Sequence, residues 1–157
     1  MNSNLLSCAK LDIPEALTLD HEMLRAGLLK AAKQPGRIGK AAERVAQLCL
    51  AHFAEEEQQV FRATGLLHDL ASDRVQSRSA AAAPMIAQLT ARHLAMRGDD
   101  QPITAAIEAL LQEAREEKNE EIAELVHSLK EHETIENQVM YPTLLFIDKS
   151  VADSLGN

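Results

Sequence analysis

Apolar residues recur every three or four positions through most of the chain, which is the spacing of one face of an α-helix. The pattern predicts a first helix over about 12–33, capped by Asp12 and with Pro14 in its first turn. The pair Pro35-Gly36 then breaks the chain, and a second helix carries apolar positions as far as Phe61.

The second half of the chain repeats this organisation. The predicted elements are a helix over 84–97, its continuation over 103–114 after a break at Gly98-Asp99-Asp100-Gln101-Pro102, a turn over 115–121 and a last helix over 120–147. We expect the last helix to bend at Pro142, because proline removes a backbone hydrogen bond. Four such rods predict an all-α, antiparallel up-down-up-down four-helix bundle. It should form one domain over residues 1–157, with its core at about 12–147.

Composition supports a helical, intracellular protein. The chain contains only 6 Gly and 5 Pro, the residues that interrupt helices, and aromatic residues make up 3% of it. A formal charge of −8 gives no reason to expect nucleic acid or an anionic membrane as a partner. Two cysteines are too few for a disulfide framework, and neither a leader-type N-terminus nor an apolar run of about 18 residues is present. We therefore expect a cytoplasmic location.

Six metal-ligating side chains fall on the predicted core faces. They are His21 on the first helix, His52 and Glu56 on the second, His93 on the third, and His132 and Glu136 on the fourth, whose core face continues to Val139. Burying such groups without partners costs roughly 1–3 kcal/mol each. A cation satisfies them together, because neutral imidazole nitrogens and carboxylate oxygens are metal ligands. The pattern predicts a metal site inside the bundle.

The ligands also repeat within the chain. His52, Glu56 and Phe61 share their spacing with His132, Glu136 and Tyr141, and His21 with Arg25 matches His93 with Arg97. Two similar halves favour a pseudo-twofold centre of two ions bridged by carboxylates. A ligand set without thiolate favours iron or manganese, whereas zinc more often takes four tetrahedral ligands. Six protein ligands leave positions open on two octahedral ions.

The segments LDHEMLR, AHFAEEEQQVF, LTARHLAM and KEHETIENQVMYP resemble the hemerythrin-like, or HHE cation-binding, family over roughly residues 12–147. The resemblance implies a bundle around two iron ions with an oxo or hydroxo bridge, and it leaves manganese or zinc open. Family roles include dioxygen binding, nitric oxide or peroxide chemistry, and iron or oxygen sensing. Leu89 replaces the fifth histidine of the oxygen carriers, and Glu136 follows His132 by four positions rather than five. Both departures favour a more open, reactive or regulatory site.

Three functions remain in competition at this stage. The first is a di-iron protein that binds or reacts with dioxygen, nitric oxide or peroxide, with turnover left open. The second is a metal- or oxygen-responsive sensor or interaction module, with a protein partner or a homodimer. The third is a metal-free scaffold with a polar core. A ferritin-like centre is disfavoured, because the single Glu-x-x-His motif, Glu124 to His127, lies off the predicted core face.

Further polar residues lie near the predicted site in the sequence. We expect Glu55, Glu57 and Glu133 to be solvated, although a rotation of the helix would let Glu55 or Glu57 compete for the site. We expect Cys49 to pack as a small hydrophobe, His127 to lie on the surface, and His68 to cap a helix or lie in a loop, with a role as supplementary ligand as the alternative. For Tyr141, packing at the end of the bundle is the preferred interpretation over hydrogen bonding to a bound ligand.

Overall fold

The computed structural model of the chain describes residues 13–58, 60–65, 67–71, 84, 87 and 100–155, and these contain helices and turns but no strand. The helices are α1 (Glu15–Ala31), α2 (Gly36–Gln58), α3 (Val60–Thr64), α4 (Leu67–Ala71), α6 (Asp100–Glu116), α7 (Glu120–Ile135), the π-helical turn η1 (Glu136–Met140) and α8 (Tyr141–Leu155). In the predicted third helix, only residues 84 and 87 are described, and both are helical.

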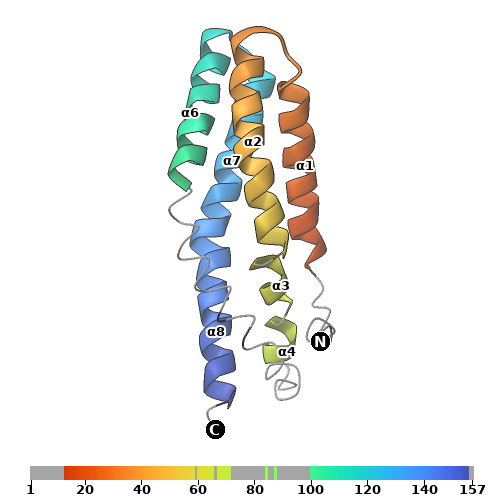
Figure 1. The fold of residues 1–157 in the computed structure, drawn as a ribbon, viewed down its shortest axis with the longest axis vertical. Helices are drawn as coiled ribbons and strands as arrows, with labels where there is room; N and C mark the ends of the chain where they lie inside the picture. Colours follow the sequence, from red (N-terminus) through yellow and green to blue (C-terminus); the bar gives the residue numbers. More distant parts are fainter. Residues whose placement is uncertain are drawn as a thin grey trace, which may run out of the picture.

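The rods alternate in direction (Figure 1). α1 and α6 run one way along the long axis, whereas α2 and the α7–α8 rod run the other way. α1 packs against α2 and α7, and α6 packs against the same two helices, so the four surround one interior. The predicted all-α, antiparallel up-down-up-down bundle is confirmed.

The helix ends differ from the predicted ones in detail. The N-cap of α1 is Pro14, and Asp12, the predicted cap, lies outside the described residues. At α7 the N-cap is Asn119, whose Oδ1 accepts a hydrogen bond from the N–H of Ile122. An asparagine side chain can satisfy one of the free N–H groups of a first turn, and proline cannot.

The last rod is interrupted just before Pro142 by the π-helical turn η1. The N–H of Tyr141 donates to the carbonyl of Glu136, five residues back, which is the bond of a π-helix. Because the π-helical turn contains one extra residue, the position that faces the core moves one residue toward the C-terminus. Met140 is therefore 5% exposed, whereas Val139 is 57% exposed, so the predicted core position of Val139 is wrong.

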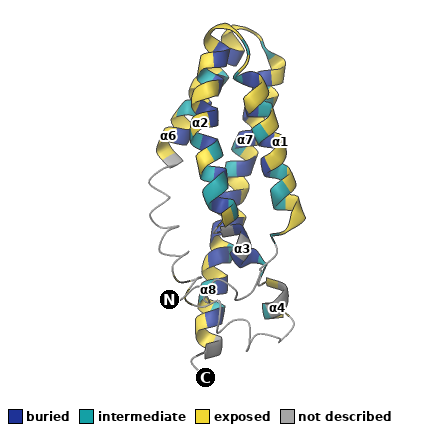
Figure 2. Ribbon diagram, turned by 45° about the vertical axis from the view of Figure 1, so that its right-hand side comes forward, coloured by how far each residue is buried: buried dark blue, intermediate teal, exposed yellow. Residues whose placement is uncertain are grey.

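Buried residues line the inner faces of the rods (Figure 2), and those that the structure describes form two apolar clusters. The larger cluster includes Leu28, Val45, Phe53, Leu110 and Leu129. The smaller cluster consists of Phe61, Ala63, Met140, Tyr141 and Leu144, from α3, η1 and α8. Within the described part of the chain, no helix is both long enough and apolar enough to span a membrane.

Candidate metal centre

A buried cluster of histidine and glutamate side chains lies between the two apolar clusters. Its members are His21 on α1, Glu56 on α2, His132 on α7 and Glu136 on η1, and their ligand atoms all lie within 4.8 Å of one another. None of the four residues is more than 6% exposed. Three of the four rods, namely α1, α2 and the rod that contains α7 and η1, therefore supply side chains to this buried polar cluster.

The donor atoms of this cluster face one another. Nε2 of His21 lies 3.1 Å from Nε2 of His132, 3.5 Å from Oε2 of Glu56 and 3.9 Å from Oε1 of Glu136. Oε1 of Glu136 also contacts Nε2 of His132. Two imidazole nitrogens at hydrogen-bond distance have to share one proton, or else turn toward a common cation.

His52 lies at the edge of the same cluster. Its Nε2 is 3.4 Å from Oε1 of Glu56 and 3.8 Å from Oε2 of Glu136, and its side chain is 10% exposed. The structure thus brings together five of the six residues that the sequence singles out. The sixth, His93, lies outside the described residues.

The carboxylates of the cluster raise the pKa values of its histidines. Burial lowers the pKa of His21, but the carboxylates of Glu136, Glu56 and Glu57 outweigh it and raise the pKa to about 9. The same balance of burial against Glu136 and Glu56 raises the pKa of His52 to about 10. Burial and the carboxylate of Glu136 act oppositely on His132, and its pKa also rises.

Glu136 shows the complementary effect. Burial disfavours its charged form, but the histidines at 132, 21 and 52 hold its pKa well below the ordinary value. The opposite pKa shifts of the histidines and of Glu136 favour protonated imidazole beside ionised carboxylate within the cluster. A bound cation would take the place of the imidazolium protons.

Two carboxylates outside the cluster hold the outer nitrogens of its histidines. Oε1 of Glu57 lies 3.0 Å from Nδ1 of His21 and 2.8 Å from Nη1 of Arg25. Oδ2 of Asp20 lies 2.6 Å from Nδ1 of His132. A carboxylate at Nδ1 fixes the ring and its tautomer, so that Nε2 points inward as a ligand.

Neither of these carboxylates was expected to act in this way. Glu57 was predicted to be solvated, and that prediction is wrong, because Arg25 and His21 hold it and lower its pKa against the opposing effect of burial. The sequence does contain a sign of this, since Arg25 follows His21 by four positions and so lies on the same helix face. Nothing in the sequence marks Asp20 as the partner of a residue on α7.

Aromatic rings enclose the cluster. Phe53 stacks on His21 with ring centroids 4.2 Å apart, and Phe61 lies 4.7 Å from the same ring. The hydroxyl of Tyr141 donates a 2.8 Å hydrogen bond to Oε1 of Glu56. Tyr141 packs in the smaller apolar cluster, as expected, but it also reaches the site, which the preferred interpretation of the sequence did not include.

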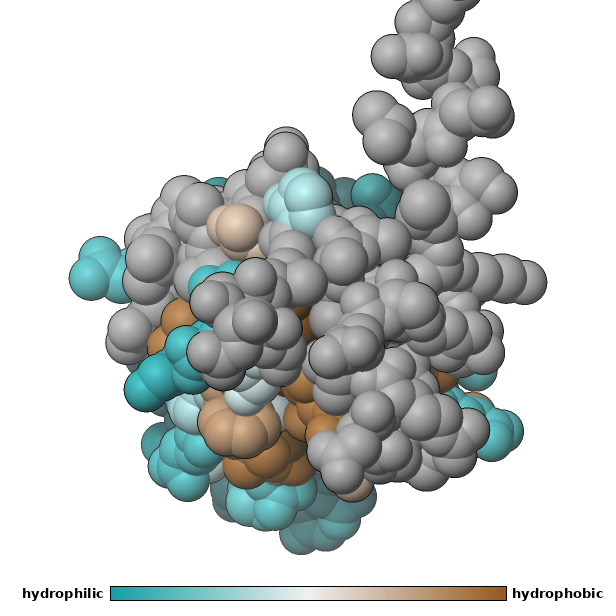
Figure 3. Space-filling model, turned by 90° about the horizontal axis from the view of Figure 1, so that it is seen from below, coloured by the Kyte–Doolittle hydropathy of each residue, from teal (hydrophilic) through white to brown (hydrophobic). Residues whose placement is uncertain are grey.

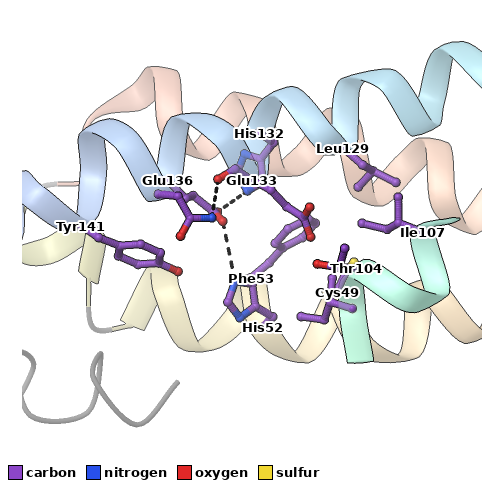
Figure 4. A pocket seen from close by; sticks show the side chains of 12 residues that line it. Cys49, His52, Phe53, Thr104, Ile107, Leu129, His132, Glu133, Glu136 and Tyr141 are labelled. Carbon is purple, nitrogen blue, oxygen red and sulfur yellow. Dashed lines mark hydrogen bonds and ion pairs between the residues drawn. The ribbon is translucent and has the colours of Figure 1, made fainter. Parts of the chain in front are cut away.

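A cavity of about 50 Å³ adjoins the cluster between α2, α6 and α7 (Figure 4). Its lining residues include His52, His132 and Glu136 together with the apolar side chains of Ile103, Ile107 and Leu129. Glu133, predicted to be solvated, is partly buried and lines this cavity instead. A volume of this size suits one or two water molecules or a diatomic molecule.

Cys49 also lines the cavity and packs in the larger apolar cluster, so its predicted role as a small hydrophobe is confirmed. Burial, with Glu133, Glu136 and Glu56 nearby, raises the pKa of its thiol to about 12. The thiol therefore remains protonated and is not a ready metal ligand.

The donor set fits a cation. Oε2 of Glu56 is buried and accepts no hydrogen bond among the described residues, whereas Oε1 of Glu136 is buried and pairs with Nε2 of His132. A buried carboxylate oxygen without a hydrogen bond is costly, and a cation placed beside it removes that cost. Imidazole and carboxylate donors without thiolate suit iron or manganese.

Three further polar residues that the sequence analysis considered are not members of the cluster. The side chain of His127 is 73% exposed and pairs with Glu131, which confirms the predicted surface position. Glu55 is partly buried beside a groove between α2 and α6 rather than fully solvated. His68 lies in α4, and its side chain is outside the described part of the structure.

The fold and the cluster together define a helical-bundle protein with a cation-binding interior. Residues 12–144 match the family described as the Hemerythrin HHE cation binding domain. The match covers most of the chain, and the chain belongs to this family. Searches of curated proteins and of solved structures give no match.

Proposed function

We propose that this protein binds two iron ions through His21, His52, Glu56, His93, His132 and Glu136, and that a small ligand occupies positions left open by these side chains. The candidate ligands are dioxygen, nitric oxide and peroxide. The observation that carries the proposal is the buried cluster of four ligand residues, in which Oε2 of Glu56 accepts no hydrogen bond among the described residues. Iron would supply Lewis-acid and redox chemistry there.

The protein's own residues would prepare and protect that centre. Asp20 and Glu57 turn the imidazoles of His132 and His21 inward. Phe53 and Phe61 pack against the ring of His21 and exclude water from it. The cavity beside His52 and Glu136 is small and largely apolar, which favours an uncharged diatomic ligand over a bulky substrate.

The test is anaerobic reconstitution with ferrous iron, followed by metal analysis and optical spectroscopy. The proposal expects about two irons per chain and charge-transfer bands that change on adding nitric oxide, peroxide or azide. His132→Ala should lose most of the metal, whereas His127→Ala, on the exposed face of the same helix, should retain it. A wild-type protein that stays colourless and free of iron contradicts the proposal.

A second candidate is a metal-responsive interaction module without turnover. Large apolar side chains are exposed on the last rod at Ile135, Val139 and Phe146, the last being 63% exposed. Figure 3 views the molecule from the end at which α8 finishes, and both apolar and hydrophilic residues are visible on this face. Such exposed apolar surface is typical of protein contacts. This candidate expects a large metal-dependent rise in melting temperature with no consumption of dioxygen or peroxide.

A further inference from the structure

The two oxygens of Glu56 have different surroundings. Oε1 accepts the hydrogen bond from the hydroxyl of Tyr141, at 2.8 Å. Oε2 accepts no hydrogen bond among the described residues and lies 3.5 Å from Nε2 of His21. Both Glu56 and Tyr141 are buried, with exposed fractions of 0% and 5%. The phenol therefore engages Oε1, which also lies 3.4 Å from Nε2 of His52, and leaves Oε2 facing His21.

The π-helical turn η1 directs this phenol at the site. In a regular α-helix, five residues cover about 500°, so Tyr141 would point roughly 140° away from Glu136. In η1 the backbone bond from Tyr141 closes on Glu136, so the two residues are separated by about one turn. In Figure 4 the tyrosine ring lies on the same side of the rod as Glu136, facing the pocket that His52 lines.

Pro142 helps to explain why the turn lies where it does. Proline has no N–H to donate and its ring collides with a carbonyl four residues earlier in an α-helix. The π-helical bond from the preceding residue, Tyr141, ends the irregular turn directly before this proline. The interruption is thus placed so that the residue ahead of the proline enters the site.

The phenol also breaks the internal symmetry of the ligand set. Phe61 stands where Tyr141 stands in the repeat, five residues after the glutamate, and it is fully buried without a hydroxyl. Glu56 therefore receives a hydrogen bond from the other half of the chain, and the repeat supplies no such group for Glu136. The two glutamates differ in their surroundings although the sequence spaces them alike.

We propose that Tyr141 is a positioning residue for the metal centre, which fixes the rotation of Glu56 so that Oε2 is presented to the cation and the two glutamates bind unequally. The inference rests on the proposed cation binding. In this proposal, the π-helical turn η1 brings the phenol of Tyr141 within hydrogen-bond distance of Glu56. Because the chain contains one tyrosine, every tyrosine signal reports on this side chain.

The experiment compares the wild type with Tyr141→Phe, which removes one oxygen atom and keeps the ring. Thr143→Val is the matched control, because it removes a hydroxyl from the same helix two residues on. Ferrous iron affinity is measured by chelator competition, and the two iron environments by Mössbauer spectroscopy. We expect Tyr141→Phe to weaken binding about 10–100-fold and to change the spectrum, with Thr143→Val matching the wild type.

Equal affinity and an identical spectrum in Tyr141→Phe overturn the inference and leave the proposed function intact. A wild type that takes up no iron contradicts the proposed function itself. If Tyr141→Phe does not fold, wild-type protein labelled with ¹³C at the tyrosine Cζ decides the matter. Its single resonance should shift when zinc is added to the metal-free protein, and a resonance that zinc leaves unmoved at saturation overturns the inference.

Discussion

Oδ2 of Asp20 on α1 lies 2.6 Å from Nδ1 of His132 on α7, although the two residues are 112 positions apart. The side chain of Asp20 is 41% exposed, whereas that of His132 is 6% exposed. A carboxylate at the rim of the bundle thus orients a histidine in its interior. The pair of Glu57 with His21 has the same form, so two of the proposed ligands are held from outside the cluster.

Replacing Asp20 should affect metal binding more than folding. Asp20→Asn removes the charge that orients His132, and we expect metal affinity to fall about 10–100-fold. Because Asp20 is substantially exposed, the change in unfolding free energy should stay within about 1 kcal/mol. Chelator competition and urea denaturation measure the two effects. Glu22→Gln, an exposed amide replacement on the same helix, is the control and should leave both unchanged.

Truncating His132 should destabilise the metal-free protein as well as empty the site. His132→Ala leaves Glu136 buried with one fewer cationic partner, and breaking a buried ion pair costs about 3–5 kcal/mol. Urea denaturation in the presence of a chelator measures this loss. The double variant His132→Ala with Glu136→Gln should recover part of it, because the uncompensated charge is removed. No recovery would show that lost packing, not charge, causes the effect.

Alkaline pH should destabilise the metal-free protein. The pKa values of His21 and His52 are raised from 6.5 to about 9 and about 10, so both bind protons more tightly when folded. The resulting stability is fully present below pH 6.5 and is lost as pH rises through about 9 to 10. Urea denaturation of chelator-treated protein at about pH 6, 8 and 10 should show a steady decline.

Acidic pH should also destabilise the protein, through Glu136. The pKa of Glu136 is lowered from 4.5, so its contribution to the free energy of unfolding is present above pH 4.5 and is lost as pH falls.

Metal binding should release protons near neutral pH, and metal affinity should rise with pH because the imidazoles must be neutral to bind. Calorimetry in buffers of different ionisation enthalpy measures this release. Stability that stays level between pH 6.5 and 10 contradicts the assigned pKa values.

Gly39, near the start of α2, should tolerate no side chain, because the turn between α1 and α2 lies against it. A Cβ atom added there would lie 1.8 Å from the backbone carbonyl oxygen of Gln34 and 2.9 Å from its carbon, so the turn would have to move. We expect Gly39→Ala to cost about 1–3 kcal/mol or more, measured by thermal unfolding. Lys40→Ala, at the exposed neighbouring position, should change stability by less than about 0.5 kcal/mol.

The sequence by itself determined the all-helical fold, the order of the rods and most inward positions among the described residues, because helix formation and amphipathic spacing are local properties. For the same reason it placed His21, His52, Glu56, His132 and Glu136 on inward faces, and the described structure brings all five together. The four motifs in their order also indicated the family that the match over residues 12–144 shows.

Only the tertiary structure decided which side chains from neighbouring helices meet. Asp20 and Glu57 hold histidines because α1 packs against α7 and α2, and no local pattern encodes those pairs. The π-helical turn likewise moved Val139 outward and Tyr141 into the site, since one added residue rotates every later position. Local spacing assumes a constant 3.6 residues per turn, and the π-helical turn before Pro142 departs from that number where the site is completed.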